Sequence, residues 1–306
     1  MQAPYITLLG GDKREIILGE ALEAEGFAVG YVGFEKYPEQ DRPPLTGLKE
    51  ALAQSRVLIA PLPGIDGTGT VKAPHTSKKI RFSKETLAWV PAGALLLTGS
   101  LPGNLAACLA GRGVLVLETA GRDDVAALNA IPTAEGVLLF ALQEQDITLQ
   151  DSTSLVTGFG RCAKALAFRL QALGSRVTIA ARRPSALAEG AMYGYRGLFL
   201  EDLKEEAGGF DLLVNTVPAL LFTRPVLQAL KPGALLIDIA SDPGGVDLQA
   251  ARGLDCKALA LPGLPGRVAP VSAGRVLARV YIPLIRRFVR GETIREEANE
   301  SETKRS

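Results

Sequence analysis

The stretch LVTGFGRCAKAL, residues 155–166, has the pattern of a buried strand that ends in a glycine-rich turn and continues into a helix. Gly158, Gly160 and Ala163 give the spacing G-x-G-x-x-A, and Gly174 is expected to close the helix before a further strand. The first glycine allows a tight turn, the second lets backbone approach a pyrophosphate, and the alanine permits close helix packing. The helix N-terminus offers N–H groups and a positive dipole end to phosphate. This context predicts a dinucleotide-binding unit of the Rossmann type.

Apolar runs of strand length alternate with helical stretches along the whole chain, and Gly or Pro stands at most transitions. This alternation is typical of parallel α/β units. The expected strands cover residues 5–11, 28–34, 56–64, 94–100 and 113–119 and then 152–160, 176–181, 210–218, 234–240 and 256–263. The predicted fold class is therefore α/β, with two Rossmann-like parallel-sheet domains joined by helical crossings.

A chain of 306 residues exceeds the usual size of one domain, so two cores are expected. We predict an N-terminal Rossmann-like or flavodoxin-like domain over residues 1–130 and a cofactor-binding Rossmann domain over 131–270. The segment 123–145 has helical periodicity, but a helix should end before Pro132 and another should begin after it. This segment is expected to connect the two domains.

The C-terminal part of the chain has two different characters. Residues 271–290 have the pattern of a long amphipathic helix, bent near Pro283, which we expect to complete the first domain. Residues 291–306 are polar and are expected to form a disordered tail.

Composition points to a protein that acts on small molecules. Hydrophobic residues make up 47% and charged residues 22% of the chain, and the net charge of +1 argues against nucleic acid or anionic lipid as a partner. The start of the chain lacks the pattern of a signal peptide, and no apolar run approaches the ~20 residues that span a bilayer, so we expect a cytoplasmic protein without membrane partners. Three widely spaced cysteines and one histidine predict neither a disulfide framework nor a metal site.

The strand that follows the glycine turn ends in AARRPS. An NAD-binding fold normally carries Asp or Glu near this position for the ribose 2′-hydroxyl. Arg182 and Arg183 can instead donate charge-assisted hydrogen bonds to a 2′-phosphate, and Ser185 adds a hydroxyl. The sequence therefore predicts NADP, while a solvated pair of arginines at a strand end is the plainer alternative.

Gly- and Pro-rich turns follow the later strands of the second half, at 215–218, 239–245 and 261–270. Ligands of open α/β sheets bind at that edge, so these turns could hold the nicotinamide ring, or they could be ordinary connections. The predicted cofactor-binding residues are Gly158, Phe159, Gly160, Arg161, Ala163, Arg182, Arg183, Ser185, Thr216, Val217, Pro218, Ser241 and Gly263.

Several motifs together resemble the A subunits of bacterial dipicolinate synthase, along nearly the whole chain. They are GGDKRE, GRDDVAALNAIPTAEG (121–136), GFGRCAKALA, LLVNTVPALL, DIASDPGGVD and ALALPGLPGRVAPVSAGRVLA. The resemblance implies NADP-dependent oxidation of dihydrodipicolinate to dipicolinate during sporulation, in the mother-cell cytoplasm. It also implies a flavoprotein-like B subunit as partner, and we expect a homo-oligomer.

A dicarboxylate substrate needs cationic groups with two parallel donors. Arg14 and Arg122 lie in the family-like motifs and are the candidates for this role, although each could pair with a nearby aspartate instead. Thr133 could cap a helix or contact substrate. The candidate proton acceptors are the carboxylates Glu135, Asp123 and Asp12.

Two other functions stay open at this stage. A hydroxyacid-type dehydrogenase needs a histidine beside an arginine and an acid, and the single histidine, His75, lies in a polar loop where solvent exposure is expected. A nucleotide-binding scaffold protein without catalytic activity would carry the same glycine motif.

Overall fold

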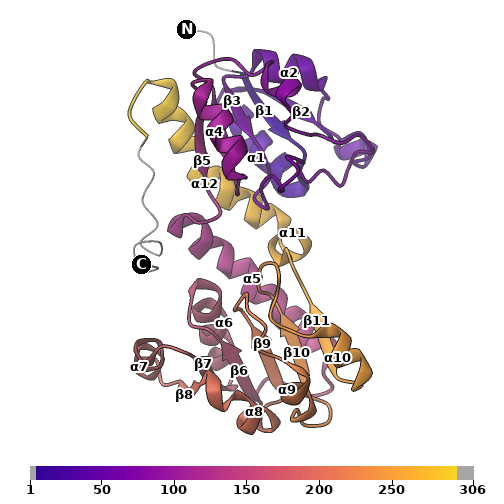
Figure 1. The fold of residues 1–306 in the computed structure, drawn as a ribbon, viewed down its shortest axis with the longest axis vertical. Coiled ribbons are helices and arrows are strands. Elements are labelled where there is room, and N and C mark those ends of the chain that lie inside the picture. Colours follow the sequence, from indigo (N-terminus) through magenta and orange to yellow (C-terminus); the bar gives the residue numbers. More distant parts are fainter. Residues whose placement is uncertain (1–4, 295–306) are drawn as a thin grey trace. The chain divides into compact units, whose positions relative to one another are not determined.

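The computed structural model describes residues 5–294, which divide into two compact units. The first unit contains residues up to Leu128 and from Pro270 onward, and the second contains Asn129–Ala269 (Figure 1). Each unit is built on its own parallel sheet, so the predicted fold class is confirmed. The tail that we predicted over 291–306 lies outside the described residues from position 295 onward.

The first unit has a five-stranded sheet in the order β2-β1-β3-β4-β5. Its strands are β1 Tyr5–Leu9, β2 Ala28–Val32, β3 Val57–Ile59, β4 Leu95–Thr98 and β5 Leu115–Glu118, and its helices are α1 Lys13–Ala24, α2 Leu48–Gln54, α3 Lys84–Leu87, α4 Gly103–Gly111 and α12 Pro270–Val289, with a 3₁₀ turn at Glu39–Asp41. Successive side chains of a strand enter different apolar clusters: Leu95 and Leu97 join one, and Leu96 joins the other. Both faces of the sheet are therefore covered.

The second unit has a six-stranded sheet in the order β11-β10-β9-β6-β7-β8. Its strands are β6 Thr153–Thr157, β7 Arg176–Ala181, β8 Arg196–Phe199, β9 Leu212–Asn215, β10 Leu235–Asp238 and β11 Lys257–Ala260, and its helices are α6 Arg161–Ala172, α7 Pro184–Met192, α8 Leu203–Glu206, α9 Arg224–Gln228, α10 Leu248–Gly253 and α11 Leu264–Val268, with 3₁₀ turns at Leu200–Asp202 and Ala207–Gly209. Strand β8 was not predicted, and it is an edge strand in which only Leu198 is buried. Its sequence RGLF has too few apolar residues to indicate a strand.

Helix α5, Asp123–Glu144, runs from the first unit into the second without a break. The prediction that one helix ends before Pro132 is therefore wrong. Thr133, which we expected to cap a new helix, lies inside α5, where its hydroxyl donates to the Asn129 carbonyl at 2.8 Å. A proline inside a helix removes one N–H donor at a moderate cost, and burial of Ala134, Val137 and Ala141 in the core of the second unit offsets it.

By length and composition alone, α5 is the one helix in residues 5–294 that could cross a membrane. Core helices of globular proteins pass the same test. One side of α5 contributes to the core of the second unit through Val137 and Ala141, which are completely buried, while Leu139 and Leu142 are exposed.

Helix α12 packs against α1 in the first unit. Gly274 makes this contact possible, because a Cβ there would lie 2.7 Å from both the Arg14 carbonyl oxygen and the Ile17 Cβ. Further along α12, Leu277, Tyr281 and Ile285 enter the core, and the helix continues through Pro283. The N-terminal turn of α1 is thereby held between the sheet and α12.

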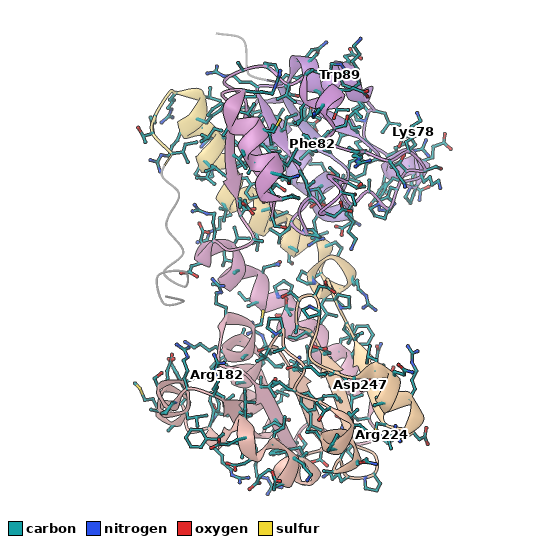
Figure 2. The ribbon with its side chains drawn as sticks, viewed as in Figure 1. Lys78, Phe82, Trp89, Arg182, Arg224 and Asp247 are labelled. Carbon is teal, nitrogen blue, oxygen red and sulfur yellow. The ribbon has the colours of Figure 1, made fainter. Side chains whose placement is uncertain are left out.

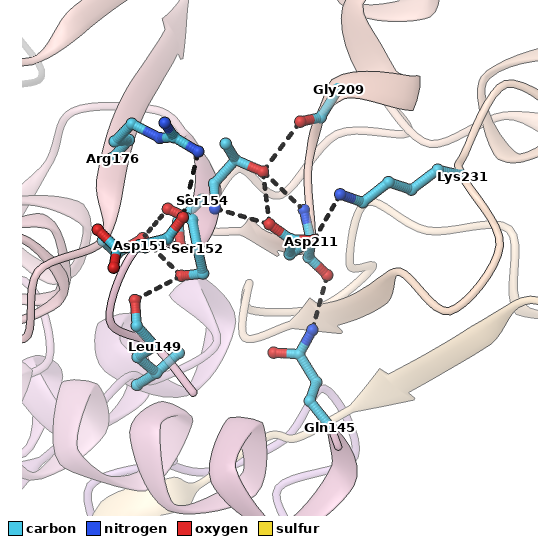
Figure 3. A network of polar contacts seen from close by, with 11 residues as sticks. Gln145, Leu149, Asp151, Ser152, Ser154, Arg176, Gly209, Asp211 and Lys231 are labelled. Carbon is cyan, nitrogen blue, oxygen red and sulfur yellow. Dashed lines mark hydrogen bonds and ion pairs between the residues drawn. The ribbon is translucent and has the colours of Figure 1, made fainter. Parts of the chain in front are cut away.

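A network of hydrogen bonds and an ion pair surrounds Asp211 at the amino edge of the second sheet (Figure 3). The carboxylate accepts hydrogen bonds of 2.7 Å from both the backbone N–H and the hydroxyl of Thr153, and it forms an ion pair with Lys231. The Asp211 carbonyl accepts from Gln145 on the segment after α5, at 2.8 Å. Burial alone would raise the pKa of Asp211, but the bonds from Lys231 and Thr153 lower it below its usual range.

We expect Asp211→Asn to lower the free energy of unfolding by about 1–3 kcal/mol at pH 7, because a charged acceptor of several hydrogen bonds is lost. The loss should shrink at acidic pH, since the lowered pKa makes this stabilisation disappear as pH falls through the folded-state value. Urea unfolding followed by far-UV circular dichroism measures it. Asp146→Asn, a change at an exposed site, is the control, and equal midpoints for the two variants would contradict the role given to Asp211.

Candidate functional site

The glycine turn lies between β6 and α6. Gly158 has φ +80°, and a Cβ there would lie 2.9 Å from Thr216 Oγ1. Gly160 is the N-cap of α6 and gives the helix no side-chain cap, and a Cβ at this position would meet nothing within 4 Å. Ala163 is completely buried in the core. The turn therefore presents an uncapped helix N-terminus with open space before it, which fits the pyrophosphate of a dinucleotide.

Arg182, Arg183 and Ser185 follow β7 and are all exposed. Arg183 is the N-cap of α7, with Pro184 at the first helical position. Figure 2 labels Arg182 at the surface of the second unit. Since β6 and β7 are parallel neighbours, these residues lie at the same edge of the sheet as the glycine turn.

The other predicted cofactor residues lie at that same carboxyl edge. Thr216 follows β9 and donates its hydroxyl to the Thr157 carbonyl at 2.7 Å. Pro218 and Ser241 are exposed in the loops after β9 and β10, and Gly263 has φ +70° at the start of α11. Parallel pairing thus gathers along one edge all the residues that the sequence assigned to the cofactor.

In the first unit, Asp12 and Arg14 form a two-point ion pair at the end of β1. Arg14 Nε and Nη2 donate to the two carboxylate oxygens of Asp12, each at 2.9 Å, and Arg14 is only 6% exposed. Asp12 also caps α1 by accepting from the Arg14 backbone N–H at 3.0 Å. Burial opposes the charge of Asp12, yet Arg14 lowers the pKa of this carboxyl, which makes it a weak base.

Arg122 makes a similar ion pair with Asp124 after β5, with an Nη2 to Oδ2 distance of 2.8 Å. Its neighbour Thr119 is bonded to the buried Tyr281 hydroxyl at 2.6 Å. Burial raises the pKa of Tyr281 strongly, and the charges of both Arg14 and Arg122 act in the opposite direction. The charges of both predicted substrate arginines therefore favour ionisation of this buried phenol, against the effect of burial.

Of the three predicted carboxylates, Asp12 forms an ion pair with a predicted substrate arginine. Glu135 is 57% exposed in its side chain and faces Arg169 of α6 across 3.8 Å in the second unit. Asp123 is exposed in the first turn of α5. Thr133 already donates its hydroxyl within α5, so toward a ligand it could act only as an acceptor.

His75 is half-buried, so the expectation of a solvent-exposed histidine is wrong. Its ring lies edge-on to Tyr37, with centroids 4.9 Å apart, and stacks at 6.4 Å on Phe34. Burial lowers its pKa, which the charge of Asp12 opposes. The loop that carries His75 packs closely against Gly10 after β1, where a Cβ would lie 2.8 Å from the Ala73 Cβ.

Glu15 is a buried residue of this site that was not predicted from the sequence. It is only 1% exposed, and its Oε2 accepts from the Asp12 backbone N–H at 2.7 Å in a capping box. Its Oε1 is buried without a hydrogen-bond partner among the described residues. Burial raises the pKa of Glu15 to about 7. The spacing D-x-x-E at 12–15 was the available signal, because it is typical of a capping box.

Comparisons with known proteins cover both units. Residues 5–120 match the family described as the N-terminal domain of the dipicolinate synthase A subunit. The chain is 32% identical over 289 residues to the A subunit of dipicolinate synthase from Bacillus subtilis strain 168, covering 92% of this chain and 95% of that one. The chain belongs to the family of dipicolinate synthase A subunits. The resemblance seen in the sequence motifs is confirmed.

Solved structures of this family have the same fold. The A subunit of dipicolinate synthase from Bacillus halodurans is 30% identical, with a TM-score of 0.84 over 93% of this chain and 99% of that one. The corresponding chain from Bacillus subtilis, also 30% identical, gives 0.83 over 95% and 99%. Residues 140–250 match the family described as D-isomer specific 2-hydroxyacid dehydrogenase, NAD binding domain, and this segment includes the glycine turn. The second unit thus carries a dehydrogenase-type domain for a nicotinamide cofactor.

Glu15→Gln should stabilise the protein at pH 8 by up to about 3 kcal/mol. The pKa of Glu15 is about 7 in the folded protein, against an ordinary value of 4.5, so its contribution is lost as pH rises through this window. Glutamine keeps the acceptor for the Asp12 N–H and carries no charge. At pH 4, below both pKa values, wild type is largely protonated in both states and the two proteins should be nearly equal in stability.

Urea unfolding followed by the fluorescence of Trp89, the single tryptophan and a residue of the first unit, tests this. Glu20→Gln on the exposed face of α1 is the matched control and should show no such pH dependence. Equal stability of Glu15→Gln and wild type at both pH values would refute the assignment.

Proposed function

We propose that this chain acts within a dipicolinate synthase and oxidises dihydrodipicolinate to dipicolinate with NADP⁺. The observation that carries the proposal is the similarity to the Bacillus subtilis protein over 92% of the chain, through both units. The uncapped turn at Gly160 and the two ion-paired arginines, Arg14 and Arg122, supply the matching chemistry. Hydride leaves a ring carbon of the substrate with its electron pair, and a proton leaves to a base or water, so the ring becomes aromatic.

In this proposal, the carboxylates of the substrate bind Arg14 and Arg122. A guanidinium has five N–H donors, and Asp12 takes two of those of Arg14 through its side-chain oxygens. The ion pair fixes the plane of the guanidinium before substrate arrives, which reduces the ordering cost on binding. Glu135, Asp123 and Asp12 are the proposed proton acceptors, and Arg14 makes Asp12 a weaker base by lowering its pKa.

The proposed cofactor-binding residues contact different parts of the dinucleotide. A bound nicotinamide supplies the carbon that accepts the hydride. Gly158, Phe159, Gly160, Arg161 and Ala163 form the turn for the pyrophosphate. Arg182, Arg183 and Ser185 bind the 2′-phosphate, while Thr216, Val217, Pro218, Ser241 and Gly263 contact the nicotinamide half. The exposure of both arginines beyond β7, where an NAD-binding fold carries an acid, supports NADP.

We further propose a flavoprotein-like B subunit as partner, because the relatives of this chain are each one component of a synthase with more than one kind of polypeptide. We also propose self-association of this chain, and we place it in the cytoplasm of the mother cell of a spore former. The proposal of a hydroxyacid dehydrogenase is weaker, because the ring of His75 is packed against Phe34 and Tyr37.

The activity is tested by the absorbance of NADPH when the purified chain is mixed with NADP⁺ and freshly made dihydrodipicolinate. The experiment is run with and without the proposed partner. NADPH formation that requires this chain supports the proposal. Binding of dinucleotide without turnover in either mixture would instead indicate a scaffold protein.

Wild type should bind NADP more tightly than NAD. Arg182→Ala and Arg183→Ala should each weaken NADP binding by roughly 10- to 150-fold, the equivalent of about 1.5–3 kcal/mol for a lost charge-assisted bond. NAD has no 2′-phosphate, so its affinity should hardly change. Gly160→Val should weaken both cofactors, because its side chain would occupy the space for the pyrophosphate.

Calorimetric titration of each variant with each cofactor provides the measurement. Arg224→Ala is the control, since Arg224 is an exposed arginine of the same unit on α9 (Figure 2). A wild type that prefers NAD, or arginine variants that keep full NADP affinity, would overturn the NADP assignment.

Arg14→Ala and Arg122→Ala should each weaken binding of dipicolinate by roughly 10- to 150-fold, with little change in dinucleotide affinity. The stable product serves as the ligand in calorimetry. Arg112→Ala, at an exposed position of the same unit, is the control. Unaltered dipicolinate affinity in both site variants would rule out the assignment.

A further inference from the structure

A chain of buried polar side chains crosses the carboxyl edge of the second sheet. Thr157, Asn215 and Asp238 are the last residues of β6, β9 and β10, three neighbouring strands. The Thr157 hydroxyl donates to Asn215 Oδ1 at 2.6 Å, and Asn215 Nδ2 donates to Asp238 Oδ1 at 2.8 Å. Thr157 and Asn215 are fully buried, and Asp238 is 7% exposed.

Asp238 uses its remaining acceptor sites on the loop after β10. Its Oδ2 accepts from the Gly245 backbone N–H at 2.8 Å, and its Oδ1 also accepts from the Ala240 N–H at 3.1 Å. A Cβ at Gly244, which has φ +81°, would lie 2.9 Å from Asp238 Oδ2. One buried carboxylate therefore holds both ends of the loop 240–245.

The same network holds the loop after β9. Asn215 Nδ2 donates to the Val217 carbonyl at 3.0 Å, and Asn215 Oδ1 accepts from the Val217 N–H at 3.2 Å. The two loops also contact each other, because the Gly245 carbonyl accepts from the backbone N–H groups of Leu221 and Phe222 at 3.0 and 2.9 Å. Thr157 directly precedes Gly158, so the network begins at the glycine turn.

We propose that Asp238, acting through Asn215 and Thr157, is the positioning residue that sets the two nicotinamide-side loops relative to the glycine turn. This rests on the proposed assignment of Thr216–Pro218 and Ser241 to the nicotinamide half. The network touches loops rather than the ribose-phosphate residues beyond β7. Loss of these hydrogen bonds should therefore weaken binding of the nicotinamide half and leave binding of the adenosine half unchanged.

The opposite edge of the sheet supplies a matched comparison. Asp211 directly precedes β9 and is also a hydrogen-bonded carboxylate, bound to Thr153 and Lys231 (Figure 3). Both aspartates stabilise ends of the same sheet, but only Asp238 lies at the carboxyl edge. A merely structural role would give Asp211→Asn and Asp238→Asn the same effect on ligands.

The experiment uses the full chain and whichever reduced dinucleotide, NADPH or NADH, wild type binds more tightly. Its affinity is measured by nicotinamide fluorescence, and that of the matching adenosine fragment, 2′,5′-ADP or ADP, by calorimetry. Asp238→Asn should weaken the dinucleotide about tenfold or more and change fragment affinity less than twofold. Asp211→Asn should change neither by more than twofold under conditions where it remains folded.

A second pair of variants distinguishes a positioning effect from a folding defect. Thr157→Val keeps the shape and removes the hydroxyl, so it should show the same selective loss, whereas Thr157→Ser keeps the hydroxyl and should restore affinity. Equal weakening of dinucleotide and fragment in Asp238→Asn and Thr157→Val would overturn the inference. Failure of wild type to bind any dinucleotide would instead overturn the proposed function, and the inference with it.

Discussion

A parallel sheet has to be covered on both faces, because every connection between its strands crosses over one face or the other. Both sheets of this chain are entirely parallel. The strands are consequently apolar in succession rather than in alternation, as in Leu95, Leu96 and Leu97, and each unit has two apolar clusters instead of one. Because the strands are parallel, their carboxyl ends all lie at one edge of each sheet. Both candidate sites lie at such an edge.

Backbone polar groups at these edges lie close to the core and need hydrogen-bond partners. Side chains at the last residue of a strand, or just beyond it, provide them. Asp12 caps α1 and binds Arg14, while Asp238 binds backbone N–H groups of its own loop. Glycine makes the approach possible at Gly158 and Gly244, where φ is positive and a Cβ would lie 2.9 Å from a side-chain oxygen. The loops are thereby shaped by hydrogen bonds rather than by apolar burial.

Much of this architecture could be predicted from the sequence because it depends on local patterns. The apolar runs marked ten of the eleven strands in residues 5–294, and the glycine spacing located the turn before α6. The strand β8 escaped because an exposed edge strand needs few apolar residues. The continuation of α5 through Pro132 depends on burial of Ala134 and Val137 against the sheet, which local helix rules do not include.

The environment of side chains was harder to predict than their positions. Arg14 and Arg122 could be identified as candidates, but their ion pairs with Asp12 and Asp124 were only one alternative in the sequence. The burial of His75 against Tyr37 depends on the path of a long loop. The hydrogen bonds between Thr157, Asn215 and Asp238 join residues separated by 58 and 23 positions in the chain.

The charges of the first unit have a consequence for the proposed substrate. Arg14 and Arg122 each have a carboxylate partner, so these two pairs are neutral as a group. A substrate carboxylate bound at Arg14 would add negative charge near Glu15, whose pKa of about 7 already reflects the cost of burying its own charge. Negative charge close to a carboxyl favours its neutral form, so substrate and proton should bind together. On the proposed function, Glu15 therefore releases its proton less readily once a substrate carboxylate is bound at Arg14.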